Sequence, residues 1–376
     1  MRSLFLAVVG CASWSGLQAQ TVVPSVAMVL PTDNRALIDG KPEDFYQFVD
    51  RSIEGKSVPV WEGGQFGFVR NPTKLTTGPM VYTRFHEGLD IKPVHRDAKD
   101  EPLDEVRSMA AGEVVHVSPK PGASNYGRYV VVQHDWPDGP LVSLYAHLRE
   151  ITCTVGQKVE AGTKLGIMGY SGAGIDRRRA HTHVEMGVYL SSRFSVWHDH
   201  QTPTLNYHGM WNGLNIVGFD LSKFLLDRIA QPTLSAAEFI KSTPVHFRVA
   251  VSGKSEMELL QHYPWLCAAP PAGKPKSWLV SFSAWGLPVK IEPSDAEVNE
   301  PTVVWVQPSS IPQFSLTRGI LNGIGERIRL SNDGLTFIQL ATGSFAAVPK
   351  AAAPVAVESL PKARKPSSKG KKKAAR

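Results

Sequence analysis

The sequence of 376 residues is long enough for two domains, and its content of 42% hydrophobic and 20% charged residues is ordinary for a globular protein. The net charge of +7 belongs to the end of the chain: residues 350–376 hold nine Lys or Arg and one Glu, a charge of +8, which leaves −1 for the rest. A nearly neutral body argues against nucleic-acid binding, which needs basic charge on a folded face.

The first twenty residues have the features of an export signal. Arg2 supplies a basic start, Leu4–Val9 is apolar, and Ala19 offers a small residue at the expected cleavage site. We therefore expect residues 1–20 to be a signal peptide and the protein to be exported to the periplasm or cell envelope. The alternative is lipidation at Cys11, because residues 8–11 are similar to a lipoprotein cleavage box. No other segment has the pattern of a transmembrane helix.

Residues 21–63 and residues 64–195 differ in the spacing of their apolar residues. Residues 21–63 are interpreted as a lead-in, with a helix expected over Pro42–Val49, which has helical spacing, an initial proline and an acidic first turn. Residues 64–195 show short apolar alternations separated by Gly, Pro, Asn and Asp. They predict an antiparallel, β-sandwich-like domain with strands at residues 112–117, 129–134, 141–145 and 164–168.

The C-terminal half predicts a second and smaller domain, so the expected fold class is mainly β. The pattern of residues 196–244 predicts a connecting loop and a helix over 219–226. Residues 245–346 predict an all-β domain with strands at 246–251, 278–282, 302–306 and 336–340. The Lys-, Ala- and Pro-rich residues 347–376 are expected to be a disordered tail, which could contact anionic envelope polymers.

Two cysteines remain after the proposed signal, Cys153 and Cys267. In an oxidising compartment they either form one disulfide or stay separate buried thiols, and the sequence does not distinguish the two.

Three short motifs carry residues suited to metal chemistry. His86 and Asp90 are four residues apart, but Gly88 argues against a helix, so they are not the helical His-Glu-x-x-His zinc motif. His181 and His183 alternate on an expected strand and therefore share one face. His147 ends another expected strand. Each motif alone is a weak signal, because isolated histidines are usually structural.

The order of the motifs is more specific than any one of them. His-x-x-x-Asp, Tyr-x-His and His-x-His resemble the lysostaphin-type zinc metallopeptidases, peptidase family M23, which have the duplicated-hybrid-motif fold. The segments between the motifs are also similar to the family, and the resemblance covers about residues 64–190. The similar segments are residues 106–115, 125–134, 155–166 and 169–172.

The resemblance implies a role for each of five residues. His86, Asp90 and His183 would bind one Zn²⁺ per chain and leave its fourth position for water, as in catalytic zinc sites. The zinc would acidify that water and polarise the scissile carbonyl. His181 would take the water's proton, and His147 would stabilise the transition state.

The implied activity is hydrolysis of peptide cross-links in bacterial peptidoglycan, with stem peptides as the partner. Stem-peptide cross-links are favoured over glycine bridges, because the chain has no evident separate wall-targeting module. The alternative is a catalytically inactive envelope protein of the same fold that binds the wall and activates a separate amidase. The presence of all five residues favours the enzyme. A third interpretation is a protein that binds the wall or envelope through its C-terminal β domain and its basic tail.

Two groups near these motifs have open interpretations. Glu185 either orients an imidazole or is solvated. Arg177–Arg179, where the family usually has small or apolar residues, either face acidic substrate groups or form a solvated loop.

Three further segments are also open. His198 and His200 form a second His-x-His to which no family motif corresponds. Residues 206–213 either line a substrate groove or pack between domains. Residues 21–60 are a candidate to cover the groove in a latent form, with Asn34 or Asn71 as a fourth zinc ligand.

Overall fold

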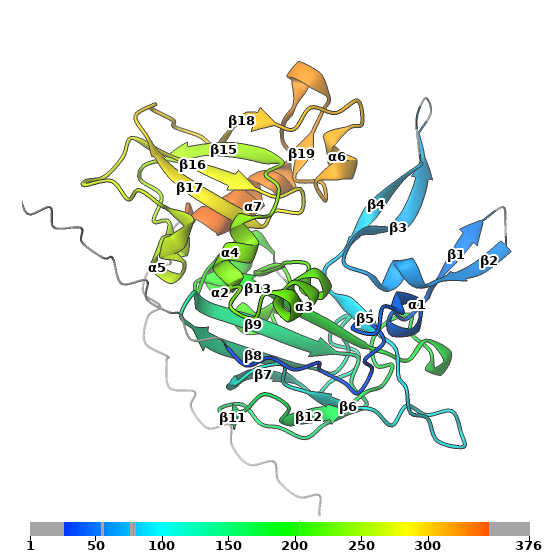
Figure 1. Ribbon diagram of the computed structural model, residues 1–376. Helices are drawn as coiled ribbons and strands as arrows, with labels where there is room; N and C mark the ends of the chain where they lie inside the picture. The colour runs from blue at the N-terminus through cyan, green and yellow to red at the C-terminus, as the bar shows by residue number, and fades with distance from the viewer. Residues whose placement is uncertain (1–25, 54–55, 76–77, 79, 203, 346–376) are drawn as a thin grey trace, which may run out of the picture. The chain divides into compact units, whose positions relative to one another are not determined.

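A computed structural model describes residues 26–53, 56–75, 78, 80–202 and 204–345 (Figure 1). The described residues up to Phe345 belong to one compact unit. The fold is mainly β, as predicted, with several antiparallel sheets. No helix in these residues is both long and apolar enough to cross a membrane. The proposed signal peptide and the basic tail lie outside the described residues.

The largest sheet carries most of the predicted strands (Figure 1). Its order is β11-β7-β8-β9-β13-β14, with β5 also paired to β13, and every pairing is antiparallel. The bounds are β5 Leu89–Ile91, β7 Gly112–Ser118, β8 Tyr129–Trp136, β9 Gly139–Ala146, β11 Lys158–Val159, β13 Thr182–Tyr189 and β14 Ile216–Gly218.

Both faces of this sheet are covered, which places β13 in the interior. All eight residues of β13 are buried. Val184, Met186 and Val188 join the main hydrophobic core, whereas Leu144 and Ala146 of the neighbouring β9 join a smaller cluster on the other face. His183 and Glu185 are paired with Ala146 and Leu144, so they lie on the face of the smaller cluster.

Three small sheets surround the central one. One has the order β10-β12-β6, and the other two are hairpins, β1–β2 and β3–β4, which extend from the body of the protein in Figure 1. The short helix α1 and the 3-10 turn η1 precede the hairpin strands. The bounds are α1 Pro42–Phe45, β1 Val49–Ile53, β2 Lys56–Val60, η1 Trp61–Gly64, β3 Gly67–Lys74, β4 Met80–His86, β6 Glu105–Arg107, β10 Glu150–Ile151 and β12 Lys164–Ile167.

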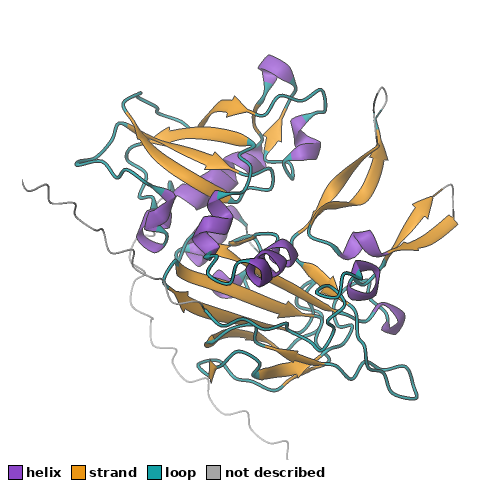
Figure 2. Ribbon diagram, in the orientation of Figure 1, coloured by secondary structure: helices purple, strands orange, loops and turns teal. Residues whose placement is uncertain are grey.

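Helices lead from the central sheet to a four-stranded C-terminal sheet of order β17-β16-β15-β18, and several of them lie between the two sheets (Figure 2). The connecting elements are η2 Arg177–Arg179, α2 Phe194–Gln201, η3 Gly209–Trp211, α3 Leu221–Ala230 and α4 Ala236–Lys241. The C-terminal elements are β15 Phe247–Ser252, α5 Glu258–His262, η4 Pro264–Leu266, β16 Ser277–Phe282, β17 Pro288–Ser294, β18 Thr302–Val306, α6 Gln313–Leu316, β19 Leu321–Asn322, η5 Gly325–Arg327, β20 Arg329–Leu330 and α7 Asn332–Thr342.

Most predicted elements are confirmed, including the strands in residues 112–117, 129–134 and 141–145 and the helix that begins near 219. The strand predicted over 336–340 is wrong, because those residues are the middle of α7. The Ser331 side chain accepts from the Gly334 amide at its start, and Gly343 closes its end in the left-handed conformation. The helix predicted over Pro42–Val49 ends early at Phe45, since Tyr46 is extended and bridges to Ile91.

The core is continuous through the compact unit. One cluster of buried apolar residues includes Leu37, strand residues of the central sheet, and Ala341 of α7. The boundaries predicted for separate domains at 64–195, 196–244 and 245–346 remain predictions. Cys153 and Cys267 are both buried and both free thiols, so the structure contains no disulfide between them.

Candidate metal centre

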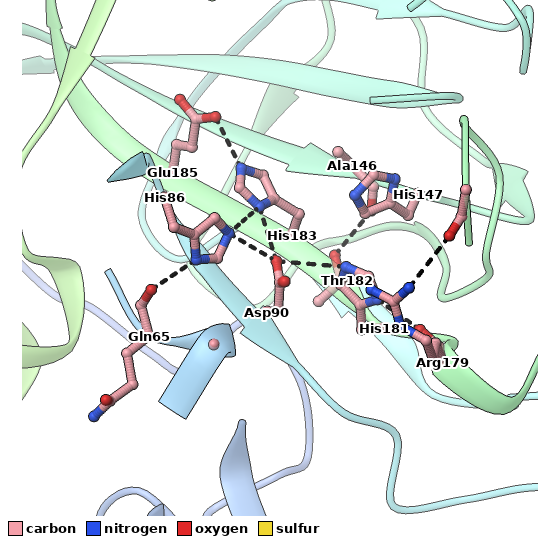
Figure 3. Close-up of polar contacts among 12 residues, drawn as sticks. Gln65, His86, Asp90, Ala146, His147, Arg179, His181, Thr182, His183 and Glu185 are labelled. Carbon is pink, nitrogen blue, oxygen red and sulfur yellow. Dashed lines mark hydrogen bonds and ion pairs between the residues drawn. The ribbon is translucent and has the colours of Figure 1, made fainter. Parts of the chain in front are cut away.

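Backbone pairing brings the five predicted residues together (Figure 3). Asp90 in β5 is the direct cross-strand partner of His183 in β13. His86 ends β4, immediately before the turn that leads into β5. His147 follows β9, the other neighbour of β13, and His181 precedes β13 and bridges to Gly169. Residues far apart in sequence therefore meet at one end of the central sheet.

Three of these side chains present ligand atoms to one point. Asp90 Oδ1 lies 3.0 Å from His86 Nε2 and 2.9 Å from His183 Nδ1, and the two imidazole nitrogens are 3.0 Å apart. These separations are close to the edge of a tetrahedron with ligands about 2.1 Å from its centre, which is about 3.4 Å. Among the described residues, this is the one group of three or more His, Cys, Asp or Glu that could hold a metal ion.

The far nitrogen of each ligand imidazole has its own fixed acceptor. His86 Nδ1 lies 2.7 Å from the Gln65 carbonyl oxygen, and His183 Nε2 lies 2.9 Å from Glu185 Oε1. A carbonyl or carboxylate oxygen can only accept, so these two nitrogens carry the protons. In neutral rings, the nitrogens that face each other and Asp90 therefore carry lone pairs. Three converging electron-pair donors need a cation or a proton between them.

Glu185 belongs to this site and is not solvated. It is 1% exposed, and its Oε1 also accepts a 2.5 Å hydrogen bond from the Tyr126 hydroxyl. A carboxylate that holds the far nitrogen of a metal-binding imidazole fixes the tautomer and the ring orientation. The interpretation of Glu185 as a residue that orients an imidazole fits this geometry, whereas the solvated alternative is wrong.

The other two histidines lie beside the cluster and outside its ligand triangle. The His147 and His181 ring centroids are 4.7 Å apart, and His181 Nε2 is 3.4 Å from Asp90 Oδ1. His147 Nδ1 lies 2.9 Å from the Ser171 carbonyl oxygen and His181 Nδ1 lies 2.7 Å from that of Arg179. Both rings therefore have Nε2 available to act as a base. His147 has a φ of 61°, a strained conformation often found at functional sites.

Burial and neighbouring charges set the protonation of the site. Burial, together with the charges of His181 and His183, holds the pKa of His147 well below its usual range, so this ring is neutral at pH 7. Burial alone would lower the pKa of His183, but its bonds to Asp90 and Glu185 raise it to about 9. A metal ion would have to displace that proton. Burial opposes ionisation of Asp90, yet His86, His181 and Arg70 lower its pKa well below the ordinary value.

Arg70 is a residue of the site that no sequence motif indicates. Its Nη2 forms an ion pair with Asp90 Oδ2, and its Nε donates to the Gly63 carbonyl oxygen at 2.8 Å. The two oxygens of Asp90 are thus divided, with Oδ1 toward the imidazoles and Oδ2 toward the guanidinium. Tyr126 is the other such residue, although it lies in residues 125–134, a segment that is similar to the family.

The centre opens into a cleft of about 930 Å³. Residues 208 and 212–214 line it, which fits the substrate-groove interpretation of segment 206–213. The C-terminal part also contributes, through residues 314, 318 and 319. The remaining lining comes from residues 70, 83–87 and 90, 124–126 and 129, 147, and 173–175, 179, 181 and 183.

Other candidates lie away from the centre. His198 is buried in α2 against Phe194 and His200 is exposed, and neither belongs to a metal-ligand group among the described residues. The Asn34 amide donates to two backbone carbonyl oxygens, and that of Asn71 donates to Thr83. Neither asparagine lines the cleft, nor does any described residue of 26–60, so the structure gives no support to a latent form closed by this segment.

The three consecutive arginines have different environments. Arg177 pairs with Glu101 and Arg178 with Asp50, so these two side chains face acids of the protein itself. Only Arg179 lines the cleft.

Comparisons with known proteins agree with this geometry. Residues 84–193 match the model of peptidase family M23. No curated protein matches the chain.

Several solved structures are similar to parts of the chain. One is a variant of the catalytic domain of the prophage-encoded M23 protein EnpA from Enterococcus faecalis. The two sequences are 23% identical, the match covers 37% of this chain and 80% of that chain, and the TM-score is 0.24. Another is the catalytic domain of the antimicrobial peptidase lysostaphin from Staphylococcus simulans. Its identity is 23%, the match covers 33% of this chain and 77% of that chain, and the TM-score is 0.23. A chain of the SpoIIQ–SpoIIIAH pore-forming complex is 21% identical; the match covers 44% of this chain and 85% of that chain, with a TM-score of 0.26.

These TM-scores are too low for the three likenesses to support an argument, so the assignment depends on the family match. That match spans the segment that holds all five predicted residues. Residues 84–193 therefore match the model of peptidase family M23, the family that the sequence resembles.

Proposed function

We propose that this protein is a zinc-dependent endopeptidase that hydrolyses peptide cross-links of peptidoglycan. The observation that carries the proposal is the convergence of His86 Nε2, Asp90 Oδ1 and His183 Nδ1, with the far nitrogen of each ring bonded to an acceptor. Two imidazoles and one carboxylate are a typical donor set for catalytic zinc, and the cleft gives a substrate access. The family match supports the peptidase class.

His86, Asp90 and His183 would hold the zinc, which would supply an acidified water molecule and a Lewis acid for the scissile carbonyl. The chain's own residues do the rest of the chemistry in this proposal. His181 Nε2 takes a proton from the attacking water, since its Nδ1 is committed to the Arg179 carbonyl oxygen. His147 is neutral and its Nδ1 proton is held by Ser171, so it stabilises the developing oxyanion or protonates the leaving amine once its Nε2 has taken up a proton from water in the cleft. Glu185 holds the His183 ring in place.

We also propose that the protein is exported and acts in the periplasm or cell envelope. This follows from the family match and from the pattern of the first twenty residues.

Metal content and wall lysis test the enzyme against an inactive relative. We expect one zinc per purified chain, and lysis of peptidoglycan that stops on chelation and returns with zinc. His183→Ala should lose zinc and lysis together. His147→Ala should keep its zinc while the rate falls about 10²- to 10⁴-fold, the range for loss of a general acid or base.

His200→Ala is the matched control, because His200 is an exposed histidine of α2 outside the cleft. It should behave like the parent protein. A purified protein without zinc, or a His183→Ala variant that lyses walls as well as the parent, would contradict the proposal and favour the inactive envelope protein. Mass spectrometry of the released fragments would identify the bond that is cut.

A further inference from the structure

The cleft is lined by more positive than negative side chains. Four arginines line it, at positions 70, 84, 179 and 318, and only two acidic residues, Glu87 and Asp90. Both acids are already engaged, since Arg70 pairs with Asp90 and Arg318 pairs with Glu87 at 2.6 Å. Arg84 and Arg179 are therefore left without an acidic partner among the residues that line the cleft.

Arg84 lies where a second positive charge is unfavourable. It is the direct cross-strand partner of Arg70 in the β3–β4 hairpin, so both side chains project from the same face. Like charges directly opposite each other destabilise a pair of strands. Arg70 is compensated by Asp90, whereas Arg84 is exposed and forms no ion pair within the described part of the chain. Its charge contributes nothing visible to the fold.

Arg179 is held beside the catalytic histidines, yet its guanidinium is poorly satisfied. Its backbone is fixed, because its amide donates to the Asp176 side chain and its carbonyl oxygen accepts from His181 Nδ1. The guanidinium makes one long contact, 3.3 Å from Nη1 to the Gly174 carbonyl oxygen. Its Nε is buried and has no hydrogen-bond partner among the described residues. Figure 3 places Arg179 next to His181, on the side of the site away from His86.

We propose that Arg84 and Arg179 each give the cleft a carboxylate-binding position, and that the peptides cleaved there carry a free carboxylate near the scissile bond. The inference depends on the proposed peptidase function and narrows its substrate class. A guanidinium binds a carboxylate with two parallel, charge-assisted hydrogen bonds. Carboxylate-bearing stem peptides meet this requirement, whereas a neutral glycine bridge offers no charge within the bridge.

The test uses two synthetic cross-linked stem-peptide dimers that differ at one position, a free carboxylate in one and a carboxamide in the other, and a pentaglycine peptide as a neutral probe. We expect the zinc-loaded protein to cleave the carboxylate dimer with a kcat/KM about 10- to 100-fold higher than the amidated one, the range for a charge-assisted hydrogen bond. The difference should appear mainly in KM and should shrink at high salt.

Substitutions assign the effect to the two arginines. Arg84→Gln and Arg179→Gln should each reduce the ratio of kcat/KM for the carboxylate dimer to that for the amidated dimer, and the double variant should bring this ratio to about 1. Arg84→Lys should keep part of the preference, which separates charge from a structural role. Arg177→Gln is the matched control, because Arg177 lies in the same turn but pairs with Glu101 outside the cleft.

The results separate this inference from the proposed function. Equal kcat/KM for the two dimers, or a preference that survives in the double variant, would overturn the subsite while leaving a zinc peptidase. Faster cleavage of pentaglycine than of the carboxylate dimer would also overturn it. A zinc-free protein that cleaves none of the three probes contradicts the proposed function itself, and the subsite with it.

Discussion

Each of the four histidines at the centre divides its two ring nitrogens between structure and chemistry. The far nitrogens of His86, His147 and His181 donate to backbone carbonyl oxygens, and that of His183 donates to a carboxylate. A backbone acceptor holds the tautomer without adding charge, whereas a carboxylate also makes the ring a better electron-pair donor. Of the three proposed ligands, His183 is therefore the one whose metal affinity should depend most on one side chain.

Substitution of that side chain should weaken metal binding. Glu185→Gln keeps the size and a carbonyl oxygen but removes the negative charge, so we expect zinc affinity to fall about 10- to 100-fold. Competition with a chromophoric chelator at pH 7 measures the affinity. Glu113→Gln is the control, because Glu113 pairs with Lys158 at the surface. An affinity equal to that of the parent would show that Glu185 has no influence on the metal site.

The residues of the centre differ in how far the sequence could reveal them. The five metal and catalytic candidates lie in motifs whose order is specific, so they could be predicted. Arg70 could not, because its contact with Asp90 depends on the position of β3, which pairs with the strand that ends at His86. The sequence shows three identical neighbours at Arg177–Arg179. It could therefore not predict that Arg177 and Arg178 form ion pairs with acids of the protein while Arg179 stays partly exposed.

At the scale of elements, the turn between β4 and β5 sets the distance from His86 to Asp90. Gly88 lies in this turn against the centre of β13. A Cβ atom there would lie 2.4 Å from the Val184 carbonyl oxygen, 2.9 Å from Glu185 Cγ and 3.0 Å from His183 Cε1. The first of these atoms belongs to the backbone of a fully buried strand and cannot easily move. Glycine is needed for this close approach and not for an unusual φ.

Gly88→Ala should therefore displace the turn and disturb the metal centre. We expect a loss of about 1–3 kcal/mol in the free energy of unfolding, as for other overpacked sites, and at least a roughly tenfold loss of zinc affinity. Denaturant unfolding and chelator competition measure the two effects. Gly122→Ala is the control, since a Cβ atom at Gly122 meets nothing within 4 Å. If Gly88→Ala binds zinc like the parent, the turn does not set the ligand geometry.

Strands with alternating apolar residues and helices with capping residues could be predicted from the sequence. The two wrong element predictions have physical causes. The apolar alternation of residues 336–340 has the period of a strand, but the capping residues Ser331 and Gly343 on either side specify helix α7. The helical spacing of Pro42–Val49 is overridden by tertiary pairing, because Tyr46 bridges to β5 and Val49 pairs in a hairpin.

At the scale of the whole compact unit, the C-terminal part packs against the strand that leads to the proposed metal centre. The Trp285 ring stacks on that of Phe85 at a centroid distance of 5.6 Å and meets Phe66 edge-on at 5.4 Å. Its Nε1 donates to the Gly218 carbonyl oxygen at 2.9 Å. Because Phe85 directly precedes His86, these contacts connect the C-terminal part to the strand that ends in a metal-ligand candidate. Arg318 adds a cation–π contact with the same Phe85.

Trp285→Ala should consequently destabilise both parts together. Trp285 is half-buried, so we expect a loss of about 2 kcal/mol, below the 3–5 kcal/mol typical of buried tryptophans. Since the core is continuous, circular dichroism and zinc release should report one coincident denaturant transition, shifted to lower concentration in the variant. Trp305→Ala, at an exposed tryptophan of β18, is the control and should cost less than about 1 kcal/mol. Two separate transitions, or a Trp285→Ala variant that loses the C-terminal signal while it keeps its zinc, would mean that the two parts fold independently.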